Sequence, residues 1–391
     1  MGWMGFPKRW SHWVFGILSS ARSSILVNGS PTFEFQCHKG MRQGDPLAPF
    51  LFILVMEALS VMFKRAVEAG LVKGVEVGKD NLHISHLLYA DDCVILGEWN
   101  RDNLKNVARV LRIFNMCSGL KIHLGKSNMY GIGVTGDEVA NMAKVVNCAA
   151  GTLPFKHLGV WIGANMNRIV NWNFIIDIFD ARLSRWRATS LSMAGRIILI
   201  KSVLESLPTY SFSLYKAPQK VIECLEVRIR RFLWGSSSDG QKIHWVAWDR
   251  VASPVDMGGL GLSKLRDTNV ALLSKWLWRF KNEPNSLWRR VIDSIHDTKR
   301  GWLHVKVNKY LPGTWNNIVK CFESVKVVGK GINCLLKGVV GNGHDISFWL
   351  DNWIGEEPLR HKYPLLFKLE KNKKAMVADK VVGGSGSNCI N

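Results

Sequence analysis

The four residues Tyr89-Ala90-Asp91-Asp92 separate two short apolar runs, and they constrain this chain more than any other segment. The runs 83–88 and 93–97 have the length and aliphatic content of β-strands, so the sequence predicts a hairpin that carries two carboxylates at its tip. Neighbouring like charges repel, and neither Ala-Asp nor Asp-Asp is a favoured tight-turn pair. A divalent cation would neutralise these carboxylates, and their hard oxygens suit Mg²⁺ or Mn²⁺. The alternative is an acidic turn that contacts only water.

A second motif lies upstream of this hairpin and opens a helix. Asp45 is expected to cap this helix, with Pro46 at its first position, where the missing N–H costs nothing. The apolar run that follows is too short to span a membrane, so we expect a buried core helix. Before it, Arg42, Gln43 and Gly44 offer a cation, an amide and a flexible backbone next to a helix start, which suits a phosphate or nucleotide. Alone, this arrangement is common to many capped helices.

In this order, the two motifs resemble the palm of a reverse transcriptase, and specifically that of the LINE-type, non-LTR retrotransposons of plants. The resemblance extends from Trp3 to about Leu369. It implies an RNA-directed DNA polymerase, a nucleotidyltransferase that uses an RNA template, a DNA primer and deoxynucleoside triphosphates. Further matching segments are 26–31, 118–127, 155–160, 191–196, 258–262, 276–280 and 341–345.

The same resemblance implies roles for individual residues. Asp91 and Asp92 would be the catalytic ligands of Mg²⁺ or Mn²⁺. Lys126 would assist the departure of pyrophosphate, and Leu158-Gly159 would position the primer. The residues expected at the nucleotide and template are Arg42, Gln43, Gly44, Tyr89 and Lys126.

The expected fold class is α+β. Residues 1–160 would form a partial palm, an antiparallel sheet with packed helices, and residues 161–300 a mostly helical, basic, thumb-like region. Residues 301–391 have no clear pattern and end in a flexible glycine- and serine-rich tail. Helical periodicity predicts one helix that is capped by Asp102 and ends at Gly119, and further helices over 181–207, 221–234 and 270–282.

One expected element of the family is absent from this sequence. In the family, a strand with the first catalytic aspartate lies just upstream of the segment that starts here at Met1, and no acidic residue precedes Glu34. Metal-assisted nucleotidyl transfer uses carboxylates from two strands to hold two ions. We therefore expect a truncated, inactive copy without primer-extension activity. The alternatives are a non-catalytic nucleic-acid-binding remnant and a translated pseudogene without a stable fold.

The charge favours a nucleic-acid partner. The chain has 52 Lys+Arg against 31 Asp+Glu, a net charge of +21, and residues 181–290 hold 19 of these cations against 8 anions. Tryptophans are interleaved with these cations, and we expect them to face inward while the arginines face outward. We expect phosphate contacts from a triplet of arginines, Arg228, Arg230 and Arg231. A charge-rich face that meets only solvent is the alternative.

The sequence contains no signal peptide and no transmembrane segment. Its eight cysteines are scattered without a Cys-x-x-Cys pair, which is typical of reduced thiols and not of a disulfide framework or a zinc site. We therefore expect an intracellular protein, in the nucleus or cytoplasm, that does not bind membranes and has no evident obligate protein partner.

Overall fold

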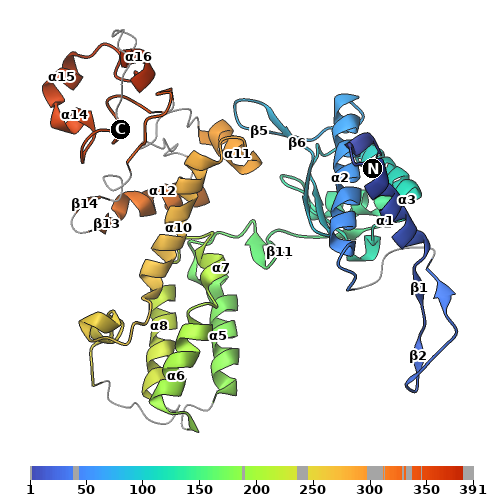
Figure 1. Cartoon of the computed structure of the whole chain (residues 1–391), viewed down its shortest axis with the longest axis horizontal. Coiled ribbons are helices and arrows are strands. Elements are labelled where there is room, and N and C mark those ends of the chain that lie inside the picture. Colours follow the sequence, from blue (N-terminus) through green and yellow to red (C-terminus); the bar gives the residue numbers. More distant parts are fainter. Residues whose placement is uncertain are drawn as a thin grey trace. The chain divides into compact units, whose positions relative to one another are not determined.

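The computed structural model describes residues 2–37, 44–186, 190–235, 245–296, 311, 313–327, 330–331, 337–344 and 346–381. The chain folds into two compact units (Figure 1). The first comprises Met1–Glu76 and His83–Leu153, and the second comprises Val77–Leu82 and Pro154–Asn391.

In the described part of the first unit, helices alternate with pairs of very short strands. β1–β4, β2–β3 and β7–β8 are antiparallel pairs, β9–β10 is parallel, and β5 pairs with β6. The helices are α1 (Lys8–Ser19), α2 (Ala48–Glu68), α3 (Arg101–Ser118) and α4 (Gly136–Val146). The strands are β1 (Arg22–Ser23), β2 (Leu26–Val27), β3 (Ser30–Pro31), β4 (Phe35–Gln36), β5 (Val75–Val77), β6 (Leu82–Ile84), β7 (His86–Tyr89), β8 (Asp92–Ile95), β9 (Asn128–Met129) and β10 (Ala149–Ala150).

The core of the first unit lies between α2, α3 and the β7–β8 hairpin. Leu59 and Phe63 of α2 are buried there against Val107 and Phe114 of α3. These spacings place each pair of side chains on one face of its helix. Leu88 of β7 packs against the same cluster. The hairpin is thus seated on two amphipathic helices.

Helix α2 begins two residues later than the sequence predicts. Its N-cap is Leu47, and Pro49, not Pro46, lies in its first turn. Asp45 does not cap the helix, because its side chain accepts the N–H of Leu47 at 2.8 Å in the turn that precedes it. The expectation of a buried helix is only half right, since the side chain of Phe50 is 68% exposed.

The N-cap of α3 lies two residues before the predicted one. Asn100, not Asp102, is the N-cap, and its side chain accepts the N–H groups of Asp102 and Asn103. An N-cap oxygen reaches the free N–H groups two or three residues ahead, so the cap must precede the helix. Asp102 lies inside the first turn, where its charge favours the helix dipole. The end at Gly119, in a left-handed conformation, is as predicted.

The described part of the second unit is largely helical. Its first core cluster buries Trp172, Phe179, Phe212, Leu225 and Leu265 completely. The helices are α5 (Asn173–Arg185), α6 (Met193–Leu199), α7 (Thr209–Phe212), α8 (Gln219–Trp234), α9 (Trp248–Val251), α10 (Leu265–Asn282), α11 (Leu287–His296), α12 (Thr314–Ser324), α14 (Leu359–Lys362), α15 (Pro364–Leu369) and α16 (Val377–Val381). The strands are β11 (Phe155–His157), β12 (Val160–Ile162), β13 (Lys326–Val327) and β14 (Lys330–Gly331).

The prediction of one helix over 181–207 was wrong. Helix α5 already ends at Arg185, and Ser192 caps a new helix, α6, by accepting the N–H of Gly195 at 3.2 Å. A serine that accepts a free N–H of the first turn favours a helix start at that point. A π-helical turn, Ile200–Leu204, then continues α6. The predicted helices over 221–234 and 270–282 are present as α8 and α10.

A second core cluster joins α10 to α11 and α12. Leu277 and Phe280 of α10 are buried against Trp315 and Phe322 of α12. The described residues as a whole therefore combine helices with small two-stranded sheets, most of them antiparallel, which agrees with the expected α+β class. Among these residues, no helix has the length and apolar character that crossing a bilayer requires.

Candidate functional site

The Tyr89–Asp92 segment forms the tight turn of the β7–β8 hairpin. Tyr89 pairs with Asp92 in the antiparallel register, so Ala90 and Asp91 are the two residues of the turn. Ala90 has a φ of 50°, a left-handed conformation that favours glycine. The hairpin is as predicted, but Asp92 is the first residue of β8 and not part of the tip. The two carboxylates therefore project from different kinds of backbone.

Strand alternation divides the hairpin into two faces. His86 and Leu88 lie opposite Ile95 and Cys93, and this face is turned toward α2. Burial raises the pKa of the Cys93 thiol to about 11. Tyr89 and Asp92 belong to the other face, and the Tyr89 side chain is 66% exposed there. The tyrosine and the carboxylate thus share one open surface.

His86 holds the buried face of the hairpin to α2. Its Nε2 lies 3.0 Å from the Ser60 hydroxyl and its Nδ1 lies 2.9 Å from the Ser85 hydroxyl. Its ring stacks on Phe63, with 5.1 Å between the ring centroids. Burial, and then the nearby charge of Lys64, lower the pKa of His86 below its usual value. Sequence reasoning missed this role because Ser60 lies 26 residues away and no local pattern links it to His86.

Asp91 and Asp92 are both exposed, and neither carboxylate forms a hydrogen bond or an ion pair with another described residue. No cluster of three histidines, cysteines or acidic residues occurs in the described part of the chain. Mg²⁺ usually binds through one or two carboxylates together with substrate phosphates and water. Two adjacent carboxylates that are exposed and unpaired fit that kind of site. When bound, such an ion would polarise phosphoryl oxygens and lower the pKa of an attacking hydroxyl.

The other predicted nucleotide contacts are only partly visible. Arg42 and Gln43 lie outside the described residues, and Gly44 has a φ of 88°, which only glycine adopts readily. Lys126 is exposed in a short 3₁₀ turn, Leu124–Lys126, beside β10. The structure brings Tyr89, Asp91 and Asp92 together on one hairpin.

Leu158 and Gly159, the predicted primer contacts, lie in the second unit as the turn between β11 and β12. Both have positive φ, 47° and 81°. Two such residues form the kind of turn that matches the twist of an antiparallel pair, normally with Asn or Gly at the first position. Leu158 is therefore in a strained conformation. The Tyr210 ring lies 3.6 Å from the position of a β-carbon on Gly159.

The three candidate arginines of α8 differ in their surroundings. Arg228 donates two hydrogen bonds to the carboxylate of Asp180 on α5, at 2.7 and 2.8 Å. This pairing lowers the pKa of Asp180 and raises that of Arg228. Arg230 lies over the Trp248 ring, 5.9 Å from its centroid. Arg231 alone of the three is exposed and has no ion pair with a described residue.

The expected division into inward tryptophans and outward arginines was wrong at α10. Arg279 lies over the rings of Trp276 and Trp288, 4.8 and 5.7 Å from their centroids. Its Nε donates to Glu283 at 2.6 Å, and the Trp288 indole N–H donates to the same carboxylate at 2.9 Å. Trp278, in contrast, is 52% exposed. Cation–π contact and ion pairing therefore make this arginine part of the packing.

Residues 3–162 match the family described as reverse transcriptase (RNA-dependent DNA polymerase). An Arabidopsis thaliana protein named for ribonuclease H is 37% identical over 47% of the chain, and the match covers 29% of that protein. An uncharacterized mitochondrial protein of the same plant is 36% identical over 28% of the chain and 88% of its own length. The Pol polyprotein of retrotransposable element R2 from Popillia japonica is 28% identical over 34% of the chain and 18% of its own length.

The chain thus spans less than a third of the first of these relatives and less than a fifth of the Pol polyprotein. The family match contains the whole β7–β8 hairpin with Tyr89, Asp91 and Asp92. It also contains the Leu158-Gly159 turn. Residues 3–162 of the chain belong to the reverse transcriptase family, and the similarity to the Pol polyprotein agrees with the branch carried by non-LTR retrotransposons.

Proposed function

We propose that this chain carries the metal-binding hairpin of an RNA-directed DNA polymerase. Asp91 and Asp92 hold Mg²⁺ or Mn²⁺ together with the phosphates of an incoming deoxynucleoside triphosphate. The observation that carries the proposal is that both carboxylates are exposed without a cationic partner among the described residues, and that Asp92 shares an open face with Tyr89. An acidic pair without a counter-ion is stabilised by a divalent cation.

The remaining assignments follow the family. Residues 1–160 are the palm, residues 161–300 a thumb-like region and residues 301–391 a C-terminal region. Arg42, Gln43 and Gly44 contact the nucleotide and template, and Tyr89 lies near the primer end. Lys126 assists the departure of pyrophosphate. Leu158 and Gly159, which form the tight turn between β11 and β12, position the primer.

Metal binding tests this proposal directly. Binding of Mn²⁺ to the full chain can be followed by electron paramagnetic resonance, with and without a deoxynucleoside triphosphate. We expect binding that the nucleotide strengthens and that the double replacement Asp91→Asn, Asp92→Asn removes. The matched control is Asp137→Asn, which removes an exposed carboxylate in the first turn of α4. Equal Mn²⁺ binding by the hairpin variant and the parent would contradict the assignment.

Primer extension on an RNA template supplies a second measurement. Any templated incorporation by this chain should disappear in the same double variant, because both carboxylates are assigned to the metal. Incorporation that persists in the variant would show that the chemistry takes place elsewhere.

A second candidate function is nucleic-acid binding without catalysis, and the surface of the second unit favours it. Several of its cations are exposed and have no ion pair with a described residue. They include Arg182, Arg185, Lys201, Lys216, Lys220, Arg231, Arg250, Arg266, Lys275 and Arg290. We propose that Arg231 is the phosphate-binding member of the α8 triplet, and that Arg228 and Arg230 support it through helix packing.

Charge replacement separates these two roles. Replacing Arg182, Arg185 and Arg231 by glutamine should weaken RNA binding by about 1–3 kcal/mol at low salt, as expected for the loss of a few phosphate contacts. The change Arg228→Gln should instead lower stability, because it leaves Asp180 unpaired. The Asp91→Asn, Asp92→Asn variant should bind RNA unchanged or slightly more tightly without divalent ions. Loss of binding only in the aspartate variant would place the partner in the first unit.

A further inference from the structure

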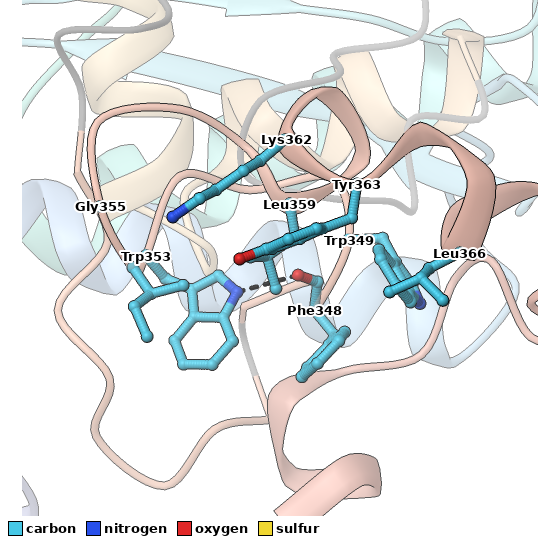
Figure 2. A pocket seen from close by; sticks show the side chains of 9 residues that line it. Phe348, Trp349, Trp353, Gly355, Leu359, Lys362, Tyr363 and Leu366 are labelled. Atoms are coloured by element: carbon cyan, nitrogen blue, oxygen red, sulfur yellow. Dashed lines mark hydrogen bonds between the residues drawn. The ribbon is translucent and has the colours of Figure 1, made fainter.

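The C-terminal part of the second unit contains a cavity of about 410 Å³. This volume falls within the roughly 300–1,000 Å³ of small-molecule sites. Figure 2 shows the rings of Phe348, Trp353 and Tyr363 together with Lys362 around it. Aromatic faces dominate the lining, and Lys362 brings its one charged group.

The cavity wall is held in place by hydrogen bonds. The Asp351 side chain, only 1% exposed, accepts the N–H of Ser347 at 2.7 Å, and the N–H of Phe348 bonds to the carbonyl of Ala375 at 2.9 Å. The Trp353 indole N–H donates to the carbonyl of Phe348 at 2.9 Å (Figure 2). The indole N–H of Trp353 is thus already used, so this residue presents its ring face to a ligand.

Two polar groups of the cavity have no such partner. The Lys362 ammonium forms no ion pair with a described residue, and it lies 5.5 Å from the centroid of the Tyr363 ring. The Tyr363 side chain is 43% exposed, and its hydroxyl makes no hydrogen bond to a described residue. In Figure 2 the Lys362 nitrogen and the Tyr363 hydroxyl point the same way, toward the end of the cavity where Trp353 lies. A planar ring joined to an anion complements this pair.

The surface beside the cavity carries a net positive charge. Residues 353–374 contain six lysines and arginines and three acidic residues, Glu356, Glu357 and Glu370. The Glu370 carboxylate is paired with Lys380 at 2.7 Å, which lowers its pKa to about 2. Lys368, Lys371, Lys373 and Lys374 are all exposed. The field around the cavity therefore attracts polyanions.

We propose that this cavity binds one nucleotide of a single-stranded nucleic acid, with the base against the rings of Trp353 and Tyr363 and the phosphate on Lys362. Stacking on aromatic side chains next to cations is the common mode of sequence-tolerant single-strand binding. The inference deepens the proposed nucleic-acid binding and rests on it. It adds a contact for the template or primer strand in residues 348–366.

Crosslinking and affinity together test this inference on the full chain. A short oligouridylate that contains 4-thiouridine, and an oligothymidylate with 4-thiothymidine, are irradiated with the protein, and the crosslinked peptides are identified by mass spectrometry. We expect crosslinks within residues 348–366, and fluorescence anisotropy should show that Tyr363→Ala weakens binding at least about fivefold, the loss of one stacked base. Tyr363→Phe, which keeps the ring and removes only the hydroxyl, should bind much more tightly than Tyr363→Ala.

A matched pair of variants tests the role of the Lys362 charge. Lys362→Gln should weaken binding several-fold more than Lys371→Gln, which removes the same charge outside the cavity lining. If Lys362→Gln and Lys371→Gln bind alike and crosslinks map elsewhere while overall binding persists, the cavity inference fails and the nucleic-acid-binding function stands. If neither oligonucleotide binds, both fail. If an acidic peptide with one phenylalanine binds the parent but not Tyr363→Ala, and the oligonucleotides do not discriminate, the cavity is a protein-docking site and the inference is overturned.

Discussion

Two residues of the β7–β8 hairpin determine how firmly its carboxylates are held. His86 fixes the buried face to α2 through Ser60, and Ala90 closes the tip in a left-handed conformation. The His86 contact adds stability that depends on the protonation of the imidazole, and the Ala90 conformation stores backbone strain. Each can be changed without altering Asp91 or Asp92.

The histidine predicts a dependence of local stability on pH. Because burial lowers the pKa of folded His86 below 6.5, the unfolded chain binds more protons just below pH 6.5. The free energy of opening the hairpin should therefore fall as the pH drops through this window, and level off below the folded pKa. Hydrogen exchange of peptides from α2 and β7 measures this free energy as a function of pH. In His86→Gln this dependence should be lost, and an unchanged dependence would mean that another group is responsible.

Relief of strain at the tip gives a second prediction. Ala90→Gly removes a left-handed strain of about 1–2 kcal/mol and adds about 0.4–1 kcal/mol of chain entropy in the unfolded state. The hairpin should become more stable, by up to about 1.6 kcal/mol, as measured by hydrogen exchange in β7 and β8. The control Ala149→Gly, in a strand without positive φ, should cost about 0.5–1 kcal/mol. Loss of stability in both variants would contradict the strained turn.

At the scale of elements, one buried amide connects three parts of the second unit. Asn269 of α10 is 2% exposed. Its Oδ1 accepts the N–H of Ala217 at 3.0 Å, and its Nδ2 donates to the carbonyls of Phe212 and Tyr215 at 2.8 and 2.9 Å. The amide thus supplies hydrogen-bond partners to backbone groups between α7 and α8, which a helix or strand would otherwise supply.

Removing this amide should destabilise the second unit. Asn269→Ala leaves three backbone groups without partners in a buried place, and we expect a loss of about 2–4 kcal/mol in unfolding free energy. Thermal and urea unfolding of the full chain would show it. Asn282→Ala, an exposed asparagine near the end of the same helix, should change stability by less than about 0.5 kcal/mol. Equal effects of the two changes would refute the role of Asn269.

Sequence patterns predicted elements where the signal is local. Apolar runs gave the β7–β8 hairpin, and helical periodicity gave α3, α8 and α10. The break before Ser192 has a local signal, a capping serine, but the apolar run on both sides hid it. Asn269 could not be found in this way, because its partners lie 52–57 residues away in the chain. The same holds for His86 at the candidate site.

At the scale of the whole molecule, the net charge of +21 makes a quantitative prediction. If the chain neutralises 4–6 phosphates, the logarithm of its affinity for RNA should fall against the logarithm of salt with a slope of roughly −3 to −5. That is a loss of about a hundredfold or more between roughly 50 and 200 mM salt. Fluorescence anisotropy over a salt series measures the slope. A flat response would indicate a basic surface without such a partner.

The candidate site was predictable only in part at this scale. Two local runs and a resemblance were enough to predict the hairpin that carries Asp91 and Asp92, although Asp92 begins β8 and does not lie at the tip. The pairing of Arg228 with Asp180 depends on how α5 packs against α8, which charge counting cannot reveal. The cavity near Trp353 also depends on packing, because its walls come from turns that lack a periodic pattern.

The strands β1–β4 and β2–β3 have a consequence for handling the protein. They form a narrow ribbon in which Leu26 is 70% exposed and Phe33 is 99% exposed. Both edges of such a ribbon offer free backbone groups to a further strand, and its apolar side chains offer a dry contact. Two copies of the chain that meet here should pair edge to edge through these strands. Because this pairing needs two copies, aggregation should increase with protein concentration. It should begin at this ribbon before either unit unfolds.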